Sequence, residues 1–352
     1  MNVIKGFEYN DCFAQQHSVD SNLIFGHLEY DLEVTIVIPT FRRGNMIREA
    51  IDSALQQNYP TEKFGVIVVD NDPQRNCETE KLMTTEYKQY SHICYYKNRE
   101  NLGLYGNWNR CFELAHSKWV VLLHDDDFLF DNFLLEAMAF LHQNNSCDIA
   151  VLKPEMENWL DDGMPFKKRN YRSKLPILSI IPLRPRDYIF LGNYFGSPTG
   201  CIFLRKVVLD QGGFNPSVYP SADTMFMLRM AMQYKVLLYC KVLGARRIGQ
   251  NVSLNIDVII KCIDSRYSVV AYLLKYFRLR FLFLRRYADY AALDYYNEIR
   301  RDLLPSFTYD LSKLNITSLG LFSQMSFRMI SKLYRWGKKI EGILGYILYN
   351  FK

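Results

Sequence analysis

The 352-residue sequence predicts an α/β fold in which helices flank a mostly parallel sheet. From Val34 onward, short apolar runs alternate with segments of helical periodicity, and this order is typical of parallel strands joined by right-handed crossovers. The composition, with 49% apolar and 23% charged residues, is that of a globular protein with a large core. No run of about 18 apolar residues occurs, so no transmembrane helix is expected.

Each expected strand is a short apolar run with a polar or turn-forming residue near its end. In chain order these runs are VTIVIP (34–39), GVIVVD (65–70), HICYYK (92–97), WVVLLH (119–124), CDIAVL (147–152) and CIFLRK (201–206). Helical spacing occurs at 44–57, 107–115, 133–141 and 223–234, and a polar helix is expected after residue 70. From about residue 251 to the end, the pattern is helical throughout.

The segment 153–187 interrupts this alternation with irregular sequence that contains several prolines. Its basic residues are Lys167, Lys168, Arg169, Arg172 and Lys174. Two interpretations stay open for this segment: a mobile loop over the functional site, or a plain surface excursion.

Acidic side chains stand at the ends of two expected strands. Asp70 closes one strand, and Asp125, Asp126 and Asp127 directly follow another. Ligands of parallel sheets bind beyond the carboxyl ends of the strands. The three adjacent carboxylates can serve as metal ligands, as an acid–base pair or as helix caps, and Mg²⁺ or Mn²⁺ would suit their oxygens. A zinc site is not expected, because the eight cysteines form no C-x-x-C pair, and His124 is expected to pack or hydrogen-bond.

Seven blocks follow one another along the chain in a characteristic order. They are VTIVIPTFRR (34–43), SALQQNYP (53–60), VIVVDND (66–72), ENLGLYGNWN (100–109), LLHDDDFLF (122–130), GGFNP (212–216) and ADTMFMLRMA (222–231). In this order and spacing they resemble the inverting glycosyltransferases of family 2, which have the GT-A fold. The resemblance implies a catalytic domain over 33–255, with a nucleotide-binding half (33–130) and an acceptor half (131–255). An N-terminal extension (1–32) and a basic helical C-terminal region (256–352) would flank it.

The resemblance also implies where the donor nucleotide would bind. Pro39 and Thr40 would lie along it, and Asp70 would accept a hydrogen bond from the N–H of a uracil ring. Asn101 and Gly103 fall in the block that lines the base and ribose, where glycine permits close backbone approach.

By the same resemblance, Asp127 is the direct ligand of Mn²⁺ or Mg²⁺, and Asp126 contacts the ribose or the metal. Asp125 is either an adapted contact or an ordinary turn residue, because His124 stands where many relatives have the first aspartate of the motif. The metal would bridge the diphosphate and neutralise the leaving group. In the segment expected after the last strand, Arg246 and Arg247 would either hold the diphosphate or lie as solvated surface arginines.

The acceptor half carries the implied catalytic base. Asp223 would deprotonate the acceptor hydroxyl, and an N-cap of the helix that it begins is the structural alternative. Relatives have an acidic residue where this chain has Ala222. Gly212, Gly213 and Phe214 are expected to form a turn that shapes the wall of the acceptor pocket.

The C-terminal region is basic and amphipathic. From residue 265 onward it has 15 basic and 6 acidic residues. Apolar residues follow one helical face at 322, 325, 329, 333, 336, 340, 343, 347 and 351, with Arg328, Lys332, Arg335, Lys338 and Lys339 close by. This pattern favours a helix that lies on an anionic membrane surface. Packing on the catalytic domain, or on a second copy in a homodimer, is the alternative.

These predictions describe an enzyme that moves a sugar from a nucleotide-diphosphate sugar, expected to be a UDP-sugar, to a hydroxyl of a glycan or lipid-linked glycan with inversion. Bacterial surface polysaccharides such as lipopolysaccharide or capsule are the expected setting. Scattered cysteines and the lack of a signal-peptide core predict a cytoplasmic protein on the inner face of the membrane, with no nucleic-acid partner. His124 and Ala222 motivate the alternative, a non-catalytic nucleotide- or glycan-binding protein on a decayed scaffold. Nucleotidyl transfer is disfavoured, since TFRRG (40–44) has one glycine.

Overall fold

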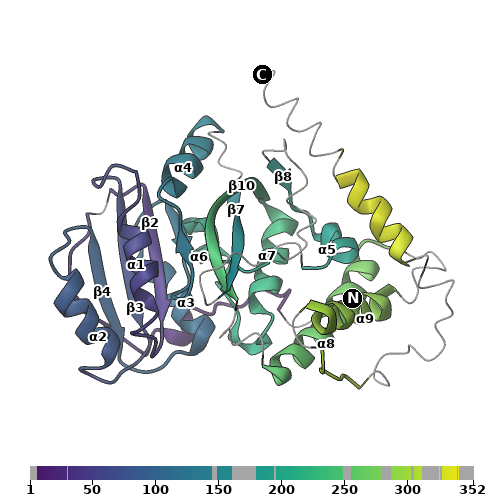
Figure 1. Cartoon of the computed structure of the whole chain (residues 1–352), viewed down its shortest axis with the longest axis horizontal. Coiled ribbons are helices and arrows are strands. Elements are labelled where there is room, and N and C mark those ends of the chain that lie inside the picture. The colour runs from purple at the N-terminus through teal and green to yellow at the C-terminus, as the bar shows by residue number, and fades with distance from the viewer. Residues whose placement is uncertain are drawn as a thin grey trace.

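The computed structural model describes residues 6–29, 31–144, 149–160, 180–193, 196–248, 255–279, 287–302, 305–310, 325, 327–338 and 340 (Figure 1). Residues 161–179, which hold the five basic residues of the expected loop, lie outside the described part. The same is true of residue 322 and of residues 343, 347 and 351 of the expected apolar face.

Within the described residues, ten strands form one mixed sheet in the order β1-β4-β3-β2-β5-β9-β7-β10-β6, with β8 paired to β10. The strands are β1 (Ser21–Phe25), β2 (Val34–Thr40), β3 (Phe64–Asp70), β4 (Ile93–Asn98), β5 (Trp119–Leu122), β6 (Phe128–Leu129), β7 (Ile149–Leu160), β8 (Ile180–Pro182), β9 (Cys201–Leu204) and β10 (Lys235–Ile248). β2 pairs in parallel with β3 and β5, and β3 pairs in parallel with β4. β9 runs antiparallel to β5 and β7. This is the α/β sheet that the sequence predicts.

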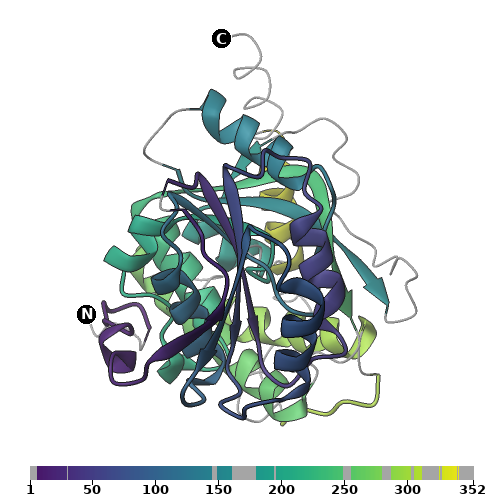
Figure 2. The same cartoon turned by 90° about the vertical axis from the view of Figure 1, so that its left-hand side faces the viewer.

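Helices cover both faces of the sheet (Figures 1 and 2). One face packs against α1 (Ile47–Leu55), α2 (Glu78–Leu82) and α4 (Phe133–Gln143), and the other against α3 (Gly103–Leu114), α6 (Arg205–Asp210) and α7 (Ala222–Gln233). The buried residues of α1, which are Ile47, Ala50, Ile51 and Ala54, follow helical spacing and form one apolar face. Every residue of β2 and of β3 is buried, as expected of strands that are covered on both faces.

Two long strands carry the second half of the sheet. β7 continues to Leu160, well beyond the predicted 147–152, and β10 pairs with it in parallel. β6 pairs antiparallel with Gly244 and Ala245 of β10. Arg246 and Arg247 therefore lie within the last strand, beside the turn that precedes β6. The sequence pattern placed both arginines after the last strand, whereas they belong to β10.

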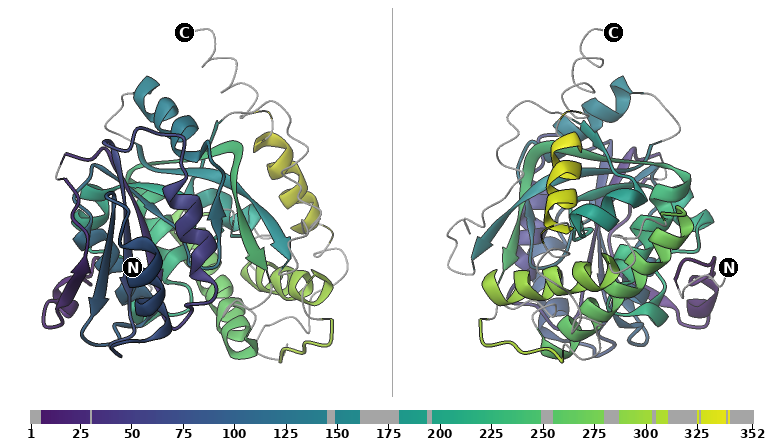
Figure 3. Two further views of the ribbon diagram at one scale, coloured as in Figure 1. Left: turned by 60° about the vertical axis from the view of Figure 1, so that its left-hand side comes forward. Right: turned by 90° about the vertical axis from the view of Figure 1, so that its right-hand side faces the viewer.

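Both flanking regions pack on the body of the molecule. β1 pairs with β4, so residues 21–25 of the predicted extension form an edge of the sheet. Helix α8 (Ile256–Tyr276) packs against α9 (Tyr287–Asp302) and α5 (Pro185–Leu191). The described residues between 325 and 340 form a further helix on the outside of the molecule, here called the tail helix (Figure 3). Across the described ranges, no helix combines the length and apolarity needed to cross a membrane.

Candidate active site

The three adjacent aspartates lie in the turn between β5 and β6, beside the carboxyl end of β2. Thr40, the last residue of β2, donates its hydroxyl to Asp125 Oδ2 at 2.8 Å. Arg43 Nη1 donates to Asp125 Oδ1 at 3.0 Å and to Asp126 Oδ2 at 2.7 Å. Burial raises the pKa of Asp125 to about 6, although the charge of Arg43 opposes this. Arg43, which the sequence pattern did not single out, is thus the countercharge that lets these carboxylates share a buried turn.

Asp127 and His124 form the other part of this turn. Asp127 Oδ1 accepts a hydrogen bond from the backbone N–H of Arg247 at 2.9 Å, and Oδ2 lies 3.6 Å from His124 Nδ1. Burial raises the pKa of Asp127 and lowers the pKa of His124. A possible metal ligand comes from each of three residues, His124, Asp126 and Asp127. The three ligand atoms lie within 4.8 Å of one another.

This cluster suits a divalent cation. Asp127 Oδ2 and His124 Nε2 are buried and have no hydrogen-bond partner among the described residues. Two carboxylates and an imidazole are ligands of Mn²⁺ and its neighbours, and the carboxylates alone also suit Mg²⁺. Asp125 is different, because both of its oxygens already accept hydrogen bonds from Thr40 and Arg43. Its contacts support the interpretation that Asp125 is a turn residue.

Asp70, the expected contact of the uracil ring, is held by several hydrogen bonds within the protein. The residue is fully buried. Its oxygens accept hydrogen bonds from Lys97 Nζ and Tyr95 OH, both at 2.7 Å, and from the backbone N–H of Asp72 at 2.9 Å. Burial lowers the pKa of Lys97, but the hydrogen bond and charge of Asp70 outweigh it, so the pKa is raised overall. Asp70 therefore joins the end of β3 to β4, and its contact with a uracil ring stays a prediction.

Of the other residues expected to contact the nucleotide, two are buried and two are exposed. Pro39 and Thr40 are buried in β2, and the Thr40 hydroxyl is committed to Asp125. Asn101 and Gly103 are exposed. Asn101 Oδ1 accepts hydrogen bonds from Gly103 N at 2.8 Å and from Asn71 Nδ2 at 2.7 Å. Gly103 has a φ of +72°, which favours glycine, and it begins α3. Contact of Asn101 and Gly103 with a base or ribose stays a prediction.

Asp223 lies half-buried in the first turn of α7, where its Oδ1 accepts a hydrogen bond from Thr224 N at 2.7 Å. Burial raises the pKa of Asp223 to about 6, against the hydrogen bonds of Thr224 and the charge of Lys153. Lys153 is a buried residue of β7 that donates to Ser197 O. Its charge also lowers the pKa of His124. The base candidate and the acidic turn are thus both within electrostatic reach of Lys153, which the sequence pattern did not indicate.

Arg246 and Arg247 differ in their relation to the acidic turn. The guanidinium of Arg246 donates to Asn158 Oδ1 from Nε at 3.2 Å and from Nη2 at 2.7 Å. Its positive charge opposes the rise that burial causes in the pKa of Asp127. Arg247 contacts Asp127 through its backbone, while its side chain pairs with Glu49 of α1. Binding of a diphosphate by either arginine stays a prediction, and Arg246 is the arginine whose charge acts on the turn.

The glycine turn at Gly212 and Gly213 is tightly packed, and the Phe214 side chain that follows it is buried. Gly212 and Gly213 have φ angles of +75° and +72°, and a side chain at either position would meet neighbouring atoms closer than 3.0 Å. Phe214 is fully buried and packs edge-on against Trp108, with ring centroids 5.4 Å apart. Trp108 in turn stacks on His124 at 5.0 Å. Phe214 therefore contacts the ring that stacks on His124, and its expected contribution to the wall of an acceptor pocket stays a prediction.

The sequence profile described as Glycosyl transferase family 2 matches residues 35–212, just over half of the chain. The chain belongs to this family. The TarS structure from Staphylococcus aureus in complex with UDP-GlcNAc aligns with a TM-score of 0.55 and 16% identity, over 84% of this chain and 79% of that one. The mannosyltransferase PcManGT from Pyrobaculum calidifontis, in complex with GDP-Man and Mn²⁺, aligns with a TM-score of 0.50 and 14% identity, over 93% and 90%. These likenesses confirm the predicted GT-A fold.

Two relatives match this chain over part of their sequences. An uncharacterised protein of Mycobacterium tuberculosis is 26% identical over 222 residues, which are 61% of this chain and 66% of that one. The poly(ribitol-phosphate) β-N-acetylglucosaminyltransferase TarS of S. aureus is 24% identical over 202 residues, which are 56% of this chain and 32% of that one. The chain thus matches 66% and 32% of the length of these two relatives, which is less than two-thirds of each.

Proposed function

We propose that this glycosyltransferase moves a sugar from a UDP-sugar to a hydroxyl of a glycan or lipid-linked glycan, with inversion. The observation that carries the proposal is the pairing of two sites around Lys153. One is the acidic turn, whose buried Asp127 Oδ2 has no hydrogen-bond partner among the described residues. The other is the half-buried Asp223 at the start of α7. A donor diphosphate with its cation and an acceptor base need such neighbouring sites.

The acidic turn would hold the donor. His124, Asp126 and Asp127 would hold a divalent cation, Mn²⁺ or Mg²⁺, which when bound stabilises negative charge on the departing diphosphate. Arg246 would add positive charge beside the same group. The exposed Asn101 and Gly103 would contact the base and ribose.

Asp223 would act as the general base. Its carboxylate takes the proton of the acceptor hydroxyl, and the hydroxyl oxygen forms a bond to the anomeric carbon. The bond from that carbon to the diphosphate oxygen breaks on the opposite side, and UDP leaves with the bonding electrons. In-line attack of this kind inverts the anomeric centre. A pKa of about 6 keeps Asp223 ionised at pH 7 and more basic than an ordinary aspartate.

Named relatives support the choice of donor and acceptor. TarS is named as an enzyme that adds N-acetylglucosamine to poly(ribitol phosphate), and its structure was solved with UDP-GlcNAc. A further relative from Bacillus spizizenii, 26% identical over 124 residues, is named as a poly(ribitol-phosphate) β-glucosyltransferase. Both names describe sugar transfer to a hydroxyl-bearing polymer, so we infer a hexosyl or N-acetylhexosaminyl donor here.

Turnover separates this proposal from a non-catalytic nucleotide- or glycan-binding protein. We expect UDP release from at least one of UDP-glucose, UDP-galactose, UDP-GlcNAc and UDP-GalNAc when Mn²⁺ is present. NMR of the sugar product should show the anomeric configuration opposite to that of the donor. If all four donors stay intact in the presence of membrane glycolipid extracts and metal, the catalytic proposal fails.

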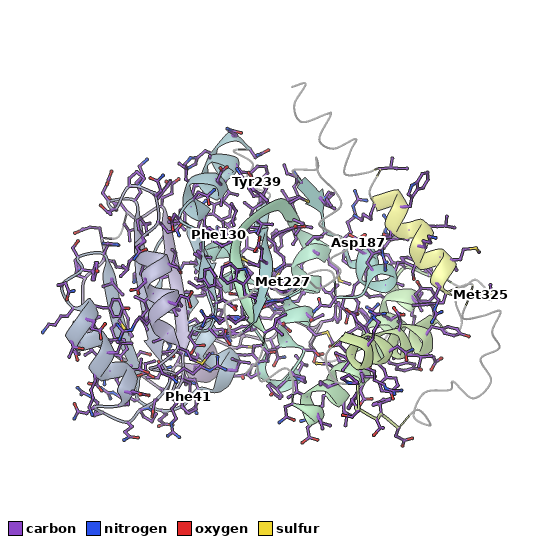
Figure 4. The ribbon with its side chains drawn as sticks, in the orientation of Figure 1. Phe41, Phe130, Asp187, Met227, Tyr239 and Met325 are labelled. Carbon is purple, nitrogen blue, oxygen red and sulfur yellow. The ribbon has the colours of Figure 1, made fainter. Side chains whose placement is uncertain are left out.

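We further propose that the tail helix rests on an anionic membrane at the cytoplasmic side, near a lipid-linked acceptor. One face of this helix packs on the protein through apolar and polar contacts. The buried Phe327 ring packs against Tyr287, with ring centroids 4.6 Å apart. Tyr334 OH donates to Asp187 Oδ1 at 2.8 Å, and Lys338 Nζ lies 3.0 Å from Asp187 Oδ2 in a buried ion pair. The Ser331 hydroxyl meets Tyr287 OH at 2.8 Å. Figure 4 shows Asp187 between this helix and the body of the molecule.

The opposite face, here called the apolar stripe, points away from the protein. Its members are Met325, Met329, Leu333, Trp336 and Ile340, with exposed fractions of 68%, 58%, 60%, 65% and 38%. Met325 projects outward in Figure 4. The exposed Arg328 and Lys332 lie along one border of the stripe, and no acidic residue occurs between 325 and 340. Apolar side chains bordered by cations are complementary to an anionic lipid surface.

Vesicle sedimentation tests this docking. We expect the protein to bind vesicles that contain phosphatidylglycerol and to bind neutral phosphatidylcholine vesicles far less. The double variant Leu333→Glu/Trp336→Glu should bind the anionic vesicles at least about tenfold more weakly, since charges in place of apolar contacts cost more than about 1.4 kcal/mol. Leu135→Glu, at an exposed position of α4, should behave like wild type. If the stripe variant instead converts a dimer to a monomer and vesicle binding is absent in wild type, the stripe joins two copies.

A further inference from the structure

We propose that His124 is a nitrogen ligand of the bound cation, and that it makes this site prefer a first-row transition ion such as Mn²⁺ over Mg²⁺. The inference rests on the proposed function only in that the cation serves the donor diphosphate. The ligand set itself follows from contacts within the turn at 124–127.

The His124 ring is held in place by packing. Its plane lies 26° from that of Trp108, with ring centroids 5.0 Å apart, and Trp108 is itself braced edge-on by Tyr105 and Phe214. The backbone N–H of His124 donates to Thr199 Oγ1 at 3.2 Å. The position of the imidazole is therefore fixed by the core before any ligand binds.

The contact between His124 and Asp127 suits two ligands of one ion better than a hydrogen bond. His124 Nδ1 lies 3.6 Å from Asp127 Oδ2, which is too long for a hydrogen bond. Two atoms that bind one cation at about 2.1 Å each lie about 3–4 Å apart. The third group, Asp126, is on the same turn.

Missing hydrogen bonds identify which groups face the cation. The Asp127 side chain is 1% exposed, and its Oδ2 has no hydrogen-bond partner in the described part of the chain. A buried polar atom without a partner is costly unless a ligand satisfies it. Asp125 next to it is fully satisfied by Thr40 and Arg43. The adjacent carboxylates therefore have different roles, and Asp127 is the one with a buried oxygen left for a ligand.

Ligand chemistry then decides the preferred metal. Mg²⁺ is a hard ion that takes oxygen ligands and keeps several waters, so a nitrogen ligand adds little to its binding. First-row transition ions bind imidazole more strongly, and Mn²⁺ also accepts carboxylates. With one imidazole and two carboxylates, we expect Mn²⁺ to bind at least tenfold more tightly than Mg²⁺.

The test uses the full chain with Mn²⁺ or Mg²⁺ alone, and again with UDP. Pulsed electron paramagnetic resonance of bound Mn²⁺ should show coupling to one imidazole nitrogen, and the coupling should shift when histidine is labelled with ¹⁵N. His124→Asp, which offers an oxygen, should lose the coupling and reduce the ratio of Mn²⁺ to Mg²⁺ affinity severalfold. His17→Asn, at an exposed position, should change neither.

Several results would overturn the inference. They are Mn²⁺ binding without nitrogen coupling, coupling that persists in His124→Asp, and no Mn²⁺ binding with or without UDP. A thermal melt of His124→Asp close to that of wild type excludes misfolding as the cause of any loss. Turnover of UDP-sugars is read separately. If turnover occurs without nitrogen coupling, the ligand inference fails and the proposed function stands. If nitrogen coupling occurs without turnover, the ligand inference stands and the proposed function fails.

Discussion

Asp223→Asn should lower kcat for sugar transfer by about 10²- to 10⁴-fold, the range that a general base contributes. Asparagine matches aspartate in size and keeps an Oδ1 that can accept the hydrogen bond from Thr224 N. The variant therefore loses the proton acceptor while the start of α7 is preserved. UDP release from the preferred donor measures the effect, and UDP affinity should stay within about twofold of wild type.

The role of Asp223 as a general base also predicts how the rate changes with pH. Burial raises the pKa of Asp223 to about 6. A general base must be ionised, so kcat/KM should fall about tenfold per pH unit below 6 and level off above it. Asp257→Asn, an exposed change in the first turn of α8, is the matched control and should keep wild-type activity. An Asp223→Asn enzyme that retains more than about a tenth of the wild-type rate would rule out this base.

Lys97→Met should destabilise the protein by about 3–5 kcal/mol, because it leaves the buried carboxylate of Asp70 without its cation. The Lys97 and Asp70 side chains are 2% and 0% exposed, and Nζ lies 2.7 Å from Oδ2. Tyr95 OH and the backbone N–H of Asp72 still donate to Asp70, but neither supplies a positive charge. The free energy of unfolding in urea measures the loss.

A second ion pair of similar length provides the control for that experiment. Arg99 and Asp20 lie 3.1 Å apart, with side chains 60% and 66% exposed. Arg99→Met should cost less than about 1 kcal/mol, because solvent screens exposed pairs. The double variant Asp70→Asn/Lys97→Met should be more stable than Lys97→Met, since no charge is then left buried alone. Equal costs for Lys97→Met and Arg99→Met would contradict the role given to the buried pair.

The sequence predicted the first half of the sheet well because the signal there is local. β2 and β3 are continuous apolar runs. The apolar residues of α1 follow helical spacing, which can be recognised without knowing what the helix packs against. The acidic turn was also predictable, since it directly follows the run that forms β5. The second half of β7 and the whole of β10 were not predicted, because their polar stretches are strands only through pairing with each other.

The site was less predictable wherever a role depends on a distant partner. Asp70 looks like a free strand-end carboxylate until Lys97, 27 residues later, pairs with it. Lys153 carries no motif, and it becomes relevant only because the fold brings β7 near the acidic turn and α7. The tail helix shows the same limit. Its apolar face was visible in the sequence, but only the docking of the opposite face on Asp187 leaves that stripe exposed.

Calorimetric titration of UDP with and without Mn²⁺, on wild type and Asp127→Asn, tests most directly whether the turn at 124–127 is the donor site. Asparagine keeps an oxygen for the N–H of Arg247 but removes the buried charge. UDP should bind the wild-type protein only when Mn²⁺ is present, and more tightly than GDP, CDP or dTDP. The variant should bind the UDP–Mn²⁺ pair at least about tenfold more weakly. Equal UDP binding by both proteins, or none by wild type, would contradict the account.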